Sequence, residues 1–207
     1  MIEEEQEQED AQYDPAFYGR REWFEEFAWQ HRWIEFMCGW WVGEFGKPSS
    51  VLDFGCGDGH WLKAFHDIGV GTVCGVELWP IANEFVTDAA QLFIHDLRKP
   101  LNLGKKAELV ICIEVAEHLS KQDGDTLCET IVQHMDNVLL FSAAGLRQQG
   151  TGHINLQSED YWVKRIEEQG AIKYSPMKTS KVRSAFGKIL NECYEFLPKN
   201  VLVFARI

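Results

Sequence analysis

The chain has 207 residues, of which 45% are hydrophobic, 25% charged and 13% aromatic. This composition fits one α/β domain with a short extension, and it excludes a wholly disordered chain and a small disulfide-rich domain. No apolar stretch approaches the roughly 20 residues that cross a bilayer. The amino terminus is rich in glutamate, where a signal peptide needs basic and then apolar residues. We therefore expect a cytoplasmic protein that has no membrane partner.

The formal net charge is -12, and it disfavours tight, non-specific binding to a nucleic-acid backbone. Five basic residues and no acid lie between Lys173 and Lys188. This basic segment is either a solvated face or a site for an anionic substrate. The six cysteines lie far apart and form no Cys-x-x-Cys pair, which predicts buried apolar side chains and not zinc ligands or disulfides.

The first part of the chain divides into two segments. Residues 1–12 form an acidic tail that we expect to be disordered. Within residues 13–47, apolar residues between Arg21 and Phe45 recur at helical spacing. Five of the eight tryptophans fall there: Trp23, Trp29, Trp33, Trp40 and Trp41. The pattern predicts a helix that either packs on the domain or forms an aromatic lid over a substrate site.

Residues 48–207 read as one domain in which short apolar strands alternate with helical segments. This alternation is typical of a parallel, doubly wound α/β sheet. The predicted strands are 51–54, 72–77, 91–95, 108–113, 137–142, 171–175 and 200–206. The predicted helices are 58–68, 79–89, 122–134, 158–169 and 179–190. The last two strands lack the βαβ rhythm and are candidates for an antiparallel edge.

A glycine-rich turn follows the first strand, in the order Asp53-Phe54-Gly55-Cys56-Gly57-Asp58-Gly59. Glycines let a backbone turn sharply and approach a ligand closely. The spacing is Gly-x-Gly-x-Gly and not the Gly-x-Gly-x-x-Gly of dinucleotide sites. Asp53 beside the turn would repel a pyrophosphate, so the turn favours a cationic ligand such as a sulfonium or ammonium amino acid.

Two further acidic residues end the next strands. Glu77 follows Asp53 by 24 residues and ends the second strand, where its carboxylate can accept from both hydroxyls of a ribose. His95 and Asp96 end the third strand, where we expect them to meet the edge of an adenine.

These ordered motifs, together with the segment 109–119, resemble those of the class I S-adenosylmethionine (SAM)-dependent methyltransferases. The resemblance spans about residues 50–207 and favours this family strongly over nicotinamide oxidoreductases. It implies a Rossmann-like seven-stranded sheet of order 3-2-1-4-5-7-6 in which strand 7 is antiparallel. The cofactor-binding residues that we predict for SAM are Asp53, Gly55, Cys56, Gly57, Gly59, Glu77, Leu78, Asp96, Leu97 and Ile113.

The fourth strand ends in Glu114-Val115-Ala116-Glu117-His118, which is similar to a Glu-x-x-Glu-His motif of two O-methyltransferase groups. One group acts on phenolic quinone precursors and the other on the 3′-terminal ribose of small RNAs. In both groups the three side chains hold a divalent cation, and such a cation lowers the pKa of a neighbouring hydroxyl. The resemblance therefore implies a cation such as Mg²⁺ or Mn²⁺ on Glu114, Glu117 and His118. The alternative is that these side chains only start a helix.

The loop after the fifth strand carries His153 within Gly150-Thr151-Gly152-His153-Ile154-Asn155. With Phe-Ser-Ala-Ala before it and Tyr-Trp after it, this run resembles a subgroup of class I enzymes. Where that subgroup has Pro-Gly-Gln-Gly-Gly, this chain has Leu-Arg-Gln-Gln-Gly over residues 146–150. We predict that His153 is a general base for a hydroxyl or a further metal ligand, while a purely structural histidine stays the alternative.

The sequence thus predicts a methyltransferase that moves the methyl group of SAM to a hydroxyl of a small molecule, such as a sugar or metabolite. An oxygen acceptor is favoured because an amine needs little activation, whereas a hydroxyl needs a base or a cation. Two alternatives stay open, an RNA 3′-end ribose 2′-O-methyltransferase and a non-catalytic methyltransferase-like binding module.

Overall fold

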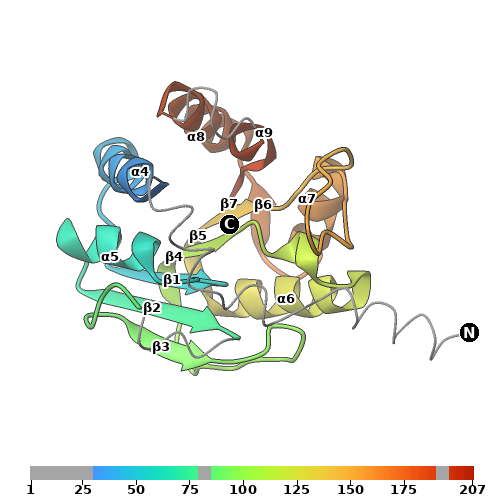
Figure 1. Cartoon of the computed structure of the whole chain (residues 1–207), viewed down its shortest axis with the longest axis horizontal. Coiled ribbons are helices and arrows are strands. Elements are labelled where there is room, and N and C mark those ends of the chain that lie inside the picture. Colours follow the sequence, from blue (N-terminus) through green and yellow to red (C-terminus); the bar gives the residue numbers. More distant parts are fainter. Residues whose placement is uncertain (1–29, 79–84, 190–195) are drawn as a thin grey trace, which may run out of the picture.

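A seven-stranded sheet forms the centre of the computed structural model, which describes residues 30–78, 85–189 and 196–207 (Figure 1). The strands are β1 (Ser50–Phe54), β2 (Thr72–Glu77), β3 (Gln91–Ile94), β4 (Ala107–Ile113), β5 (Met135–Ser142), β6 (Ile172–Tyr174) and β7 (Leu202–Arg206). Their order is β3-β2-β1-β4-β5-β7-β6. The first five strands pair in parallel, and β7 is antiparallel to both β5 and β6. The predicted order and direction are confirmed.

The helices follow the strands largely as the periodicity predicts. They are α4 (Gln30–Phe45), α5 (His60–Asp67), α6 (Lys121–His134), α7 (Glu159–Glu167), α8 (Pro176–Ile189), α9 (Leu197–Asn200) and the 3₁₀ turn η1 (Ala116–His118). The short helix α9 was not predicted. Of the helix expected over 79–89, residues 79–84 lie outside the described part of the chain and residues 85–89 are not helical.

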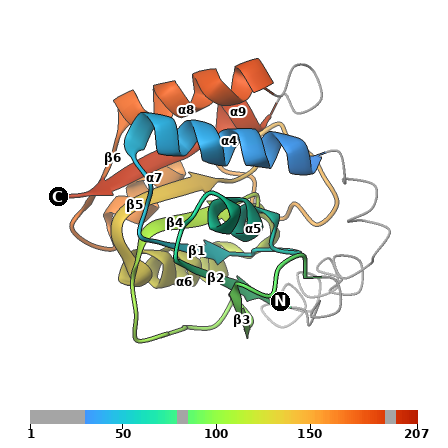
Figure 2. The ribbon, with the colours of Figure 1, turned by 90° about the vertical axis from the view of Figure 1, so that its left-hand side faces the viewer.

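Alternating side chains of the buried strands separate two cores, one on each face of the sheet. On β4, Leu109 and Ile111 join the core beneath α4, α5 and α8, while Val110 and Cys112 join the core beneath α6 and α7. Figures 1 and 2 show the corresponding layers, with α4, α5 and α8 on the side of the sheet that faces the viewer in Figure 2. Strands covered on both faces read as continuous apolar runs, which explains their clear signal in the sequence.

Helix α4 is part of the first core and not a separate cover. Its buried face includes Trp33, Met37 and Trp41. The Trp33 ring meets the rings of Trp61 on α5 and Phe186 on α8 edge to face, with centroids 5.6 and 5.7 Å apart. The packing interpretation therefore holds for α4. The tail 1–12 and residues 13–29 of the predicted lid segment lie outside the described residues, and a lid role stays a prediction.

Five of the six cysteines lie in the described part of the chain, and all five are buried free thiols. This confirms the expected apolar role for those five, while Cys193 lies outside the described residues. Among the helices that the structure describes, none is long and apolar enough to cross a membrane.

The packing of α4 makes a stability prediction. Trp41 is 4% exposed in the core, whereas Phe36 on the same helix is 61% exposed. Trp41→Ala should lower the free energy of unfolding by about 3–5 kcal/mol, because it leaves a cavity. Phe36→Ala is the matched control, and it should change that free energy by less than about 0.5 kcal/mol. Equal urea midpoints for the two variants would contradict the packing of α4.

Candidate cofactor and acceptor site

The turn after β1 adopts a backbone conformation that only glycine adopts easily. Gly55, Gly57 and Gly59 have φ angles of 74°, 52° and 90°, all in the left-handed region. A Cβ atom on Gly55 would lie 2.4 Å from Cγ2 of Val115, and one on Gly59 would lie 2.5 Å from the Phe85 ring. The glycines therefore let the turn close against the loop after β4, ahead of α5.

Glu77 fixes the middle of this turn from the neighbouring strand. The N–H of Gly57 donates to Oε2 of Glu77 at 2.9 Å, and the N–H of Leu78 donates to Oε1 at 2.8 Å. A carboxylate offers about four acceptor positions, so these two bonds leave it able to accept from ribose hydroxyls as well. Glu77 thus lies where the sequence placed it, at the end of β2 and against the glycine turn.

Asp53 lies in the interior at the end of β1, and only 2% of its surface is exposed. Burial raises the pKa of Asp53 to about 8, and the negative charge of Glu77 adds to the rise. Burying a carboxyl group beside a second one is unfavourable unless a positive charge accompanies it. This charge environment suits a cationic ligand and would repel a pyrophosphate.

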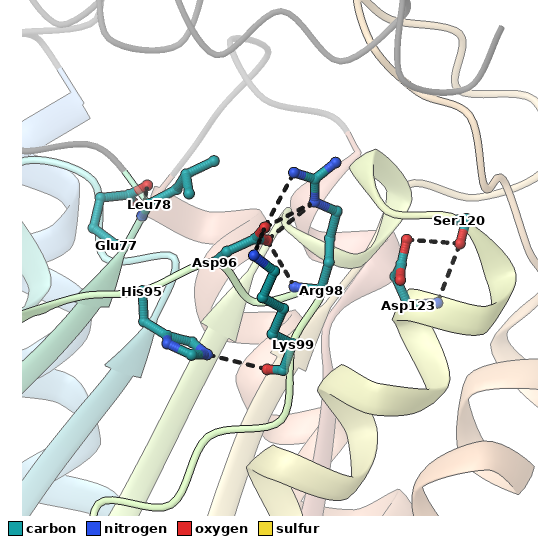
Figure 3. A network of polar contacts seen from close by, with 8 residues as sticks. All are labelled: Glu77, Leu78, His95, Asp96, Arg98, Lys99, Ser120 and Asp123. Carbon is teal, nitrogen blue, oxygen red and sulfur yellow. Dashed lines mark hydrogen bonds and ion pairs between the residues drawn. The ribbon is translucent and has the colours of Figure 1, made fainter. Parts of the chain in front are cut away.

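Asp96 lies after β3, the next strand along, and Figure 3 shows it with Glu77 and His95. Arg98 donates to the Asp96 carboxylate from its backbone N–H and from its guanidinium, at distances between 3.0 and 3.2 Å. Partial burial acts to raise the pKa of Asp96, but these bonds outweigh it and lower the pKa below its usual value. The carboxylate is thus held in a fixed orientation. The His95 ring forms a hydrogen bond to the carbonyl of Lys99.

The remaining predicted cofactor residues lie around the same edge of the sheet. Cys56 is buried and donates its N–H to the Val76 carbonyl. Leu97 is buried in the second core, and Ile113 ends β4 at the border of the first. Because the carboxyl ends of parallel strands meet at one edge, the structure brings the predicted cofactor residues to that edge. Their binding role stays a prediction.

The loop after β4 turns sharply at Glu114. This residue has a φ of 55°, and no other non-glycine residue in the described part of the chain has a positive φ. Its N–H donates to both the carbonyl and the hydroxyl of Ser142 at the end of β5, each at 3.1 Å. The turn leads into η1, so a helical turn does start where the metal interpretation required one.

Glu117, His118 and His153 meet beside this turn. Each residue offers one ligand atom, and these atoms lie within 4.8 Å of one another. Nδ1 of His118 faces the Gly152 carbonyl at 3.0 Å, and Nδ1 of His153 faces the Gln148 carbonyl at 2.8 Å. A carbonyl can only accept, so Nδ1 carries the proton in each neutral ring and Nε2 carries the lone pair.

The charge states of this group fit a cation. Glu117 is fully buried, and neither carboxylate oxygen has a hydrogen-bond partner among the described residues. Burial, followed by the nearby Glu114, raises the pKa of Glu117 well above its ordinary value. Burial lowers the pKa of His118 to about 4, although its bond to Gly152 opposes the shift, so the imidazole is neutral at pH 7. A buried carboxyl group without a hydrogen-bond partner and two imidazole nitrogens form a ligand set that suits a divalent cation.

Glu114 lies near Glu117 but is not one of the three residues whose ligand atoms lie within 4.8 Å of one another. Its Oε2 accepts from the side-chain amide of Gln148 at 3.1 Å, and that amide in turn accepts from Asn200 at 2.6 Å. The structure thus brings together Glu117, His118 and His153 of the predicted metal set, while the role of Glu114 as a further ligand stays a prediction. The sequence analysis missed the contact of Gln148 with Asn200, because the two residues are 52 positions apart and no spacing pattern links them.

The basic segment 173–188 is largely neutralised within the protein. Lys178 lies over the Phe45 ring, 4.5 Å from its centroid. The ion pairs of the segment are Lys173 with Glu167, Lys181 with Glu44, and Arg183 with Glu159. Four of its five basic side chains therefore contact acidic or aromatic residues of α4 or α7. This favours a solvated face over a site for an anion.

Comparison with known proteins agrees with this architecture. The sequence profile of the methyltransferase domain family matches residues 20–171. The SAM-bound magnesium protoporphyrin IX methyltransferase of Synechocystis PCC 6803 is 17% identical, with a TM-score of 0.63 over 86% of this chain and 80% of that one. SAM-bound CalS10, an amino pentose methyltransferase from Micromonospora echinaspora, is 13% identical, with a TM-score of 0.65 over 89% and 97%.

A third structural neighbour is a putative methyltransferase in complex with the Haloferax volcanii Trm112 activator, 12% identical with a TM-score of 0.64 over 91% of this chain and 95% of that one. A comparison with curated proteins finds no match. The family profile covers well over half of the sequence, and the neighbours share its sheet. The chain therefore belongs to the methyltransferase domain family and has the Rossmann-like fold of the class I SAM-dependent methyltransferases.

Proposed function

We propose that the protein transfers the methyl group of SAM to a hydroxyl oxygen of a small molecule at the carboxyl edge of the sheet. The observation that carries the proposal is the group Glu117, His118 and His153, whose ligand atoms lie within 4.8 Å of one another. A hydroxyl is a poor nucleophile and needs a base or a cation, whereas a neutral amine needs little such help.

The residues around the glycine turn fit SAM as the methyl donor. Glu77 would accept from the ribose hydroxyls, Asp96 would meet the adenine, and Asp53 would offset the positive charge of the sulfonium amino acid. The two SAM-bound neighbours support this choice, because they share the sheet that presents these positions.

Three observations favour a small acceptor over RNA. The net charge is -12, and three of the five basic side chains of the basic segment form ion pairs within the protein. Two neighbours act on small molecules, a magnesium porphyrin and an amino pentose. The Glu-x-x-Glu-His resemblance still supports an RNA-end substrate, and gel-shift binding at physiological salt would reveal it. The intact Asp53–Glu77 pair argues against a binding module without catalysis.

In the proposed reaction the acceptor oxygen attacks the methyl carbon in line, the C–O bond forms, and the C–S bond breaks. Nε2 of His153 takes the hydroxyl proton, because the Gln148 carbonyl holds the proton of that ring on Nδ1. The chain otherwise aligns donor and acceptor and excludes water. Nε2 has a single lone pair, so a cation would be the alternative to this base: held by Glu117, His118 and His153, it would lower the pKa of the acceptor hydroxyl when bound.

The raised pKa of Asp53 makes a pH prediction. Asp53 is mostly protonated in the free protein at pH 7, since its pKa is about 8. A bound sulfonium favours the ionised form, so binding should release about one proton. SAM affinity should therefore rise with pH, by up to about tenfold per unit, and level off above pH 8. Calorimetry in buffers of different ionisation enthalpy measures the released proton.

Asp53→Asn is the control for this pH prediction, because it removes the titrating group while SAM keeps its own titration. The variant should bind more weakly and should lose the part of the proton release that Asp53 contributes. Identical proton release in the two proteins would show that Asp53 does not sense the ligand charge.

The cation is tested by binding and by turnover. Mn²⁺ titrated into the protein should bind, and Glu117→Ala, His118→Ala and His153→Ala should each weaken that binding by at least about tenfold. His66→Ala is the control, because His66 is an exposed histidine on α5. SAM affinity should stay near the wild-type value in all four variants.

Methyl transfer to fractionated cell metabolites should be lost on exhaustive chelation and return when Mg²⁺ or Mn²⁺ is added. Full turnover without any cation would refute the metal. His153 would then stand alone as the base, and His153→Ala should still lower kcat by about 100–10,000-fold.

A further inference from the structure

Gln148 joins three segments that are far apart in the sequence. Its side-chain amide donates to Oε2 of Glu114 at 3.1 Å, in the loop after β4. The same amide accepts from Nδ2 of Asn200 at 2.6 Å, at the end of α9. One side chain in the loop after β5 therefore connects the central strand of the sheet with the helix that precedes β7.

The backbone of the same residue holds His153. The Gln148 carbonyl accepts from Nδ1 of His153 at 2.8 Å, and the loop between them folds closely around the ring. A Cβ atom on Gly150 would lie 2.6 Å from Nε2 and Cε1 of His153, so only glycine lets the ring pack there. The Gln148 N–H bonds in turn to the Gly145 carbonyl at 2.9 Å. The position of Gln148 thus sets both the orientation and the tautomer of His153.

The partner of the Gln148 amide is a strained residue. Glu114 holds a φ of 55°, which costs a non-glycine residue of order 1 kcal/mol and persists only where the surroundings impose it. The bonds to Ser142 fix its backbone, and Gln148 fixes its carboxylate. The second oxygen, Oε1, is buried and has no hydrogen-bond partner in the part of the chain that the structure describes. The Glu114 carboxylate also lies near the buried Glu117, and it contributes to the raised pKa of that group.

We propose that Gln148 is a positioning residue, supported by Asn200, that holds Glu114 and His153 in one fixed arrangement around the acceptor. This inference rests on the proposed function, in which His153 acts at the acceptor hydroxyl. The chemistry of the amide explains why glutamine stands there: it donates to a carboxylate and accepts from an amide at the same time, which neither a carboxylate nor an ammonium can do. The adjoining Gln149 is exposed, and we expect it to have no positioning role.

The test compares Gln148→Glu with Gln149→Glu. Both variants add the same charge to the same loop, but only Gln148→Glu replaces the amide N–H that Glu114 accepts with a carboxylate oxygen. With ¹⁴C-methyl SAM and the acceptor-containing metabolite fraction, Gln148→Glu should lower kcat by up to about 100-fold. The Kd for SAM should stay unchanged, and Gln149→Glu should behave as wild type. Equal kcat values for the two variants would overturn the proposal.

Two further measurements separate this role from a merely structural one and from the proposed function. Long-range ¹H–¹⁵N spectra should show His153 as the Nδ1–H tautomer in wild type and Gln149→Glu, and as a mixture in Gln148→Glu. The double variant Glu114→Gln with Gln148→Glu exchanges donor and acceptor, so it should restore the single tautomer. A single tautomer in Gln148→Glu, or no recovery in the double variant, would contradict the inference even where no methylated oxygen is found.

A weaker variant keeps the test decisive where Gln148→Glu does not fold. Asn200→Ala removes only the bond that orients the Gln148 amide, and it should give a smaller fall in kcat with the same mixture of His153 tautomers. An unchanged tautomer in folded Asn200→Ala would remove Asn200 from the arrangement.

Discussion

The site depends on the parallel pairing of β4 and β5. Their register places Ile113 opposite Ser142, so the next residue, Glu114, can donate its N–H to both acceptors of that serine. This contact turns the chain into η1 and delivers Glu117 and His118 toward the loop after β5. The Ile154 and Asn155 amides then bond back to the Glu117 carbonyl, so the loop that carries His153 is held against the same turn. Without this register, the three side chains would not meet.

Two carboxyl groups are buried at the carboxyl edge of the sheet, and the same physical cause raises the pKa of both. Asp53 beside the glycine turn and Glu117 beside the histidines both have raised pKa values because burial disfavours their charged forms. A protein gains no stability from such groups unless a positive charge joins them. In our account a sulfonium joins the first and a cation the second, so the free energy of ligand binding includes the ionisation of groups that folding leaves neutral. The same edge would then bring donor and acceptor together.

Much of the fold could be predicted because its signals are local. Short sequence segments contain the signals for the glycine turn, for the strands covered on both faces and for the position of Glu77. The helix expected at residues 85–89 is absent, although those residues lay inside a helical pattern. The contact of Gln148 with Asn200 joins residues 52 apart, and no spacing rule reports it. Glu114 was assigned to the metal group from its neighbours in sequence; that role stays a prediction, and no local pattern indicated that its carboxylate also accepts from Gln148. The basic segment could not be interpreted without knowing which acidic side chains α4 and α7 bring beside it.

The chemical identity of the atom that receives the methyl group tests the central claim most directly. ¹³C-methyl SAM should be incubated with the protein and with separate metabolite and RNA fractions, and the carbon shift of the product identifies the new bond. Our account predicts a methyl group on an oxygen of a small molecule, formed by wild type and lost in His153→Ala while that variant still binds SAM. A methyl group on nitrogen or carbon, or a product found in the RNA fraction alone, would contradict it.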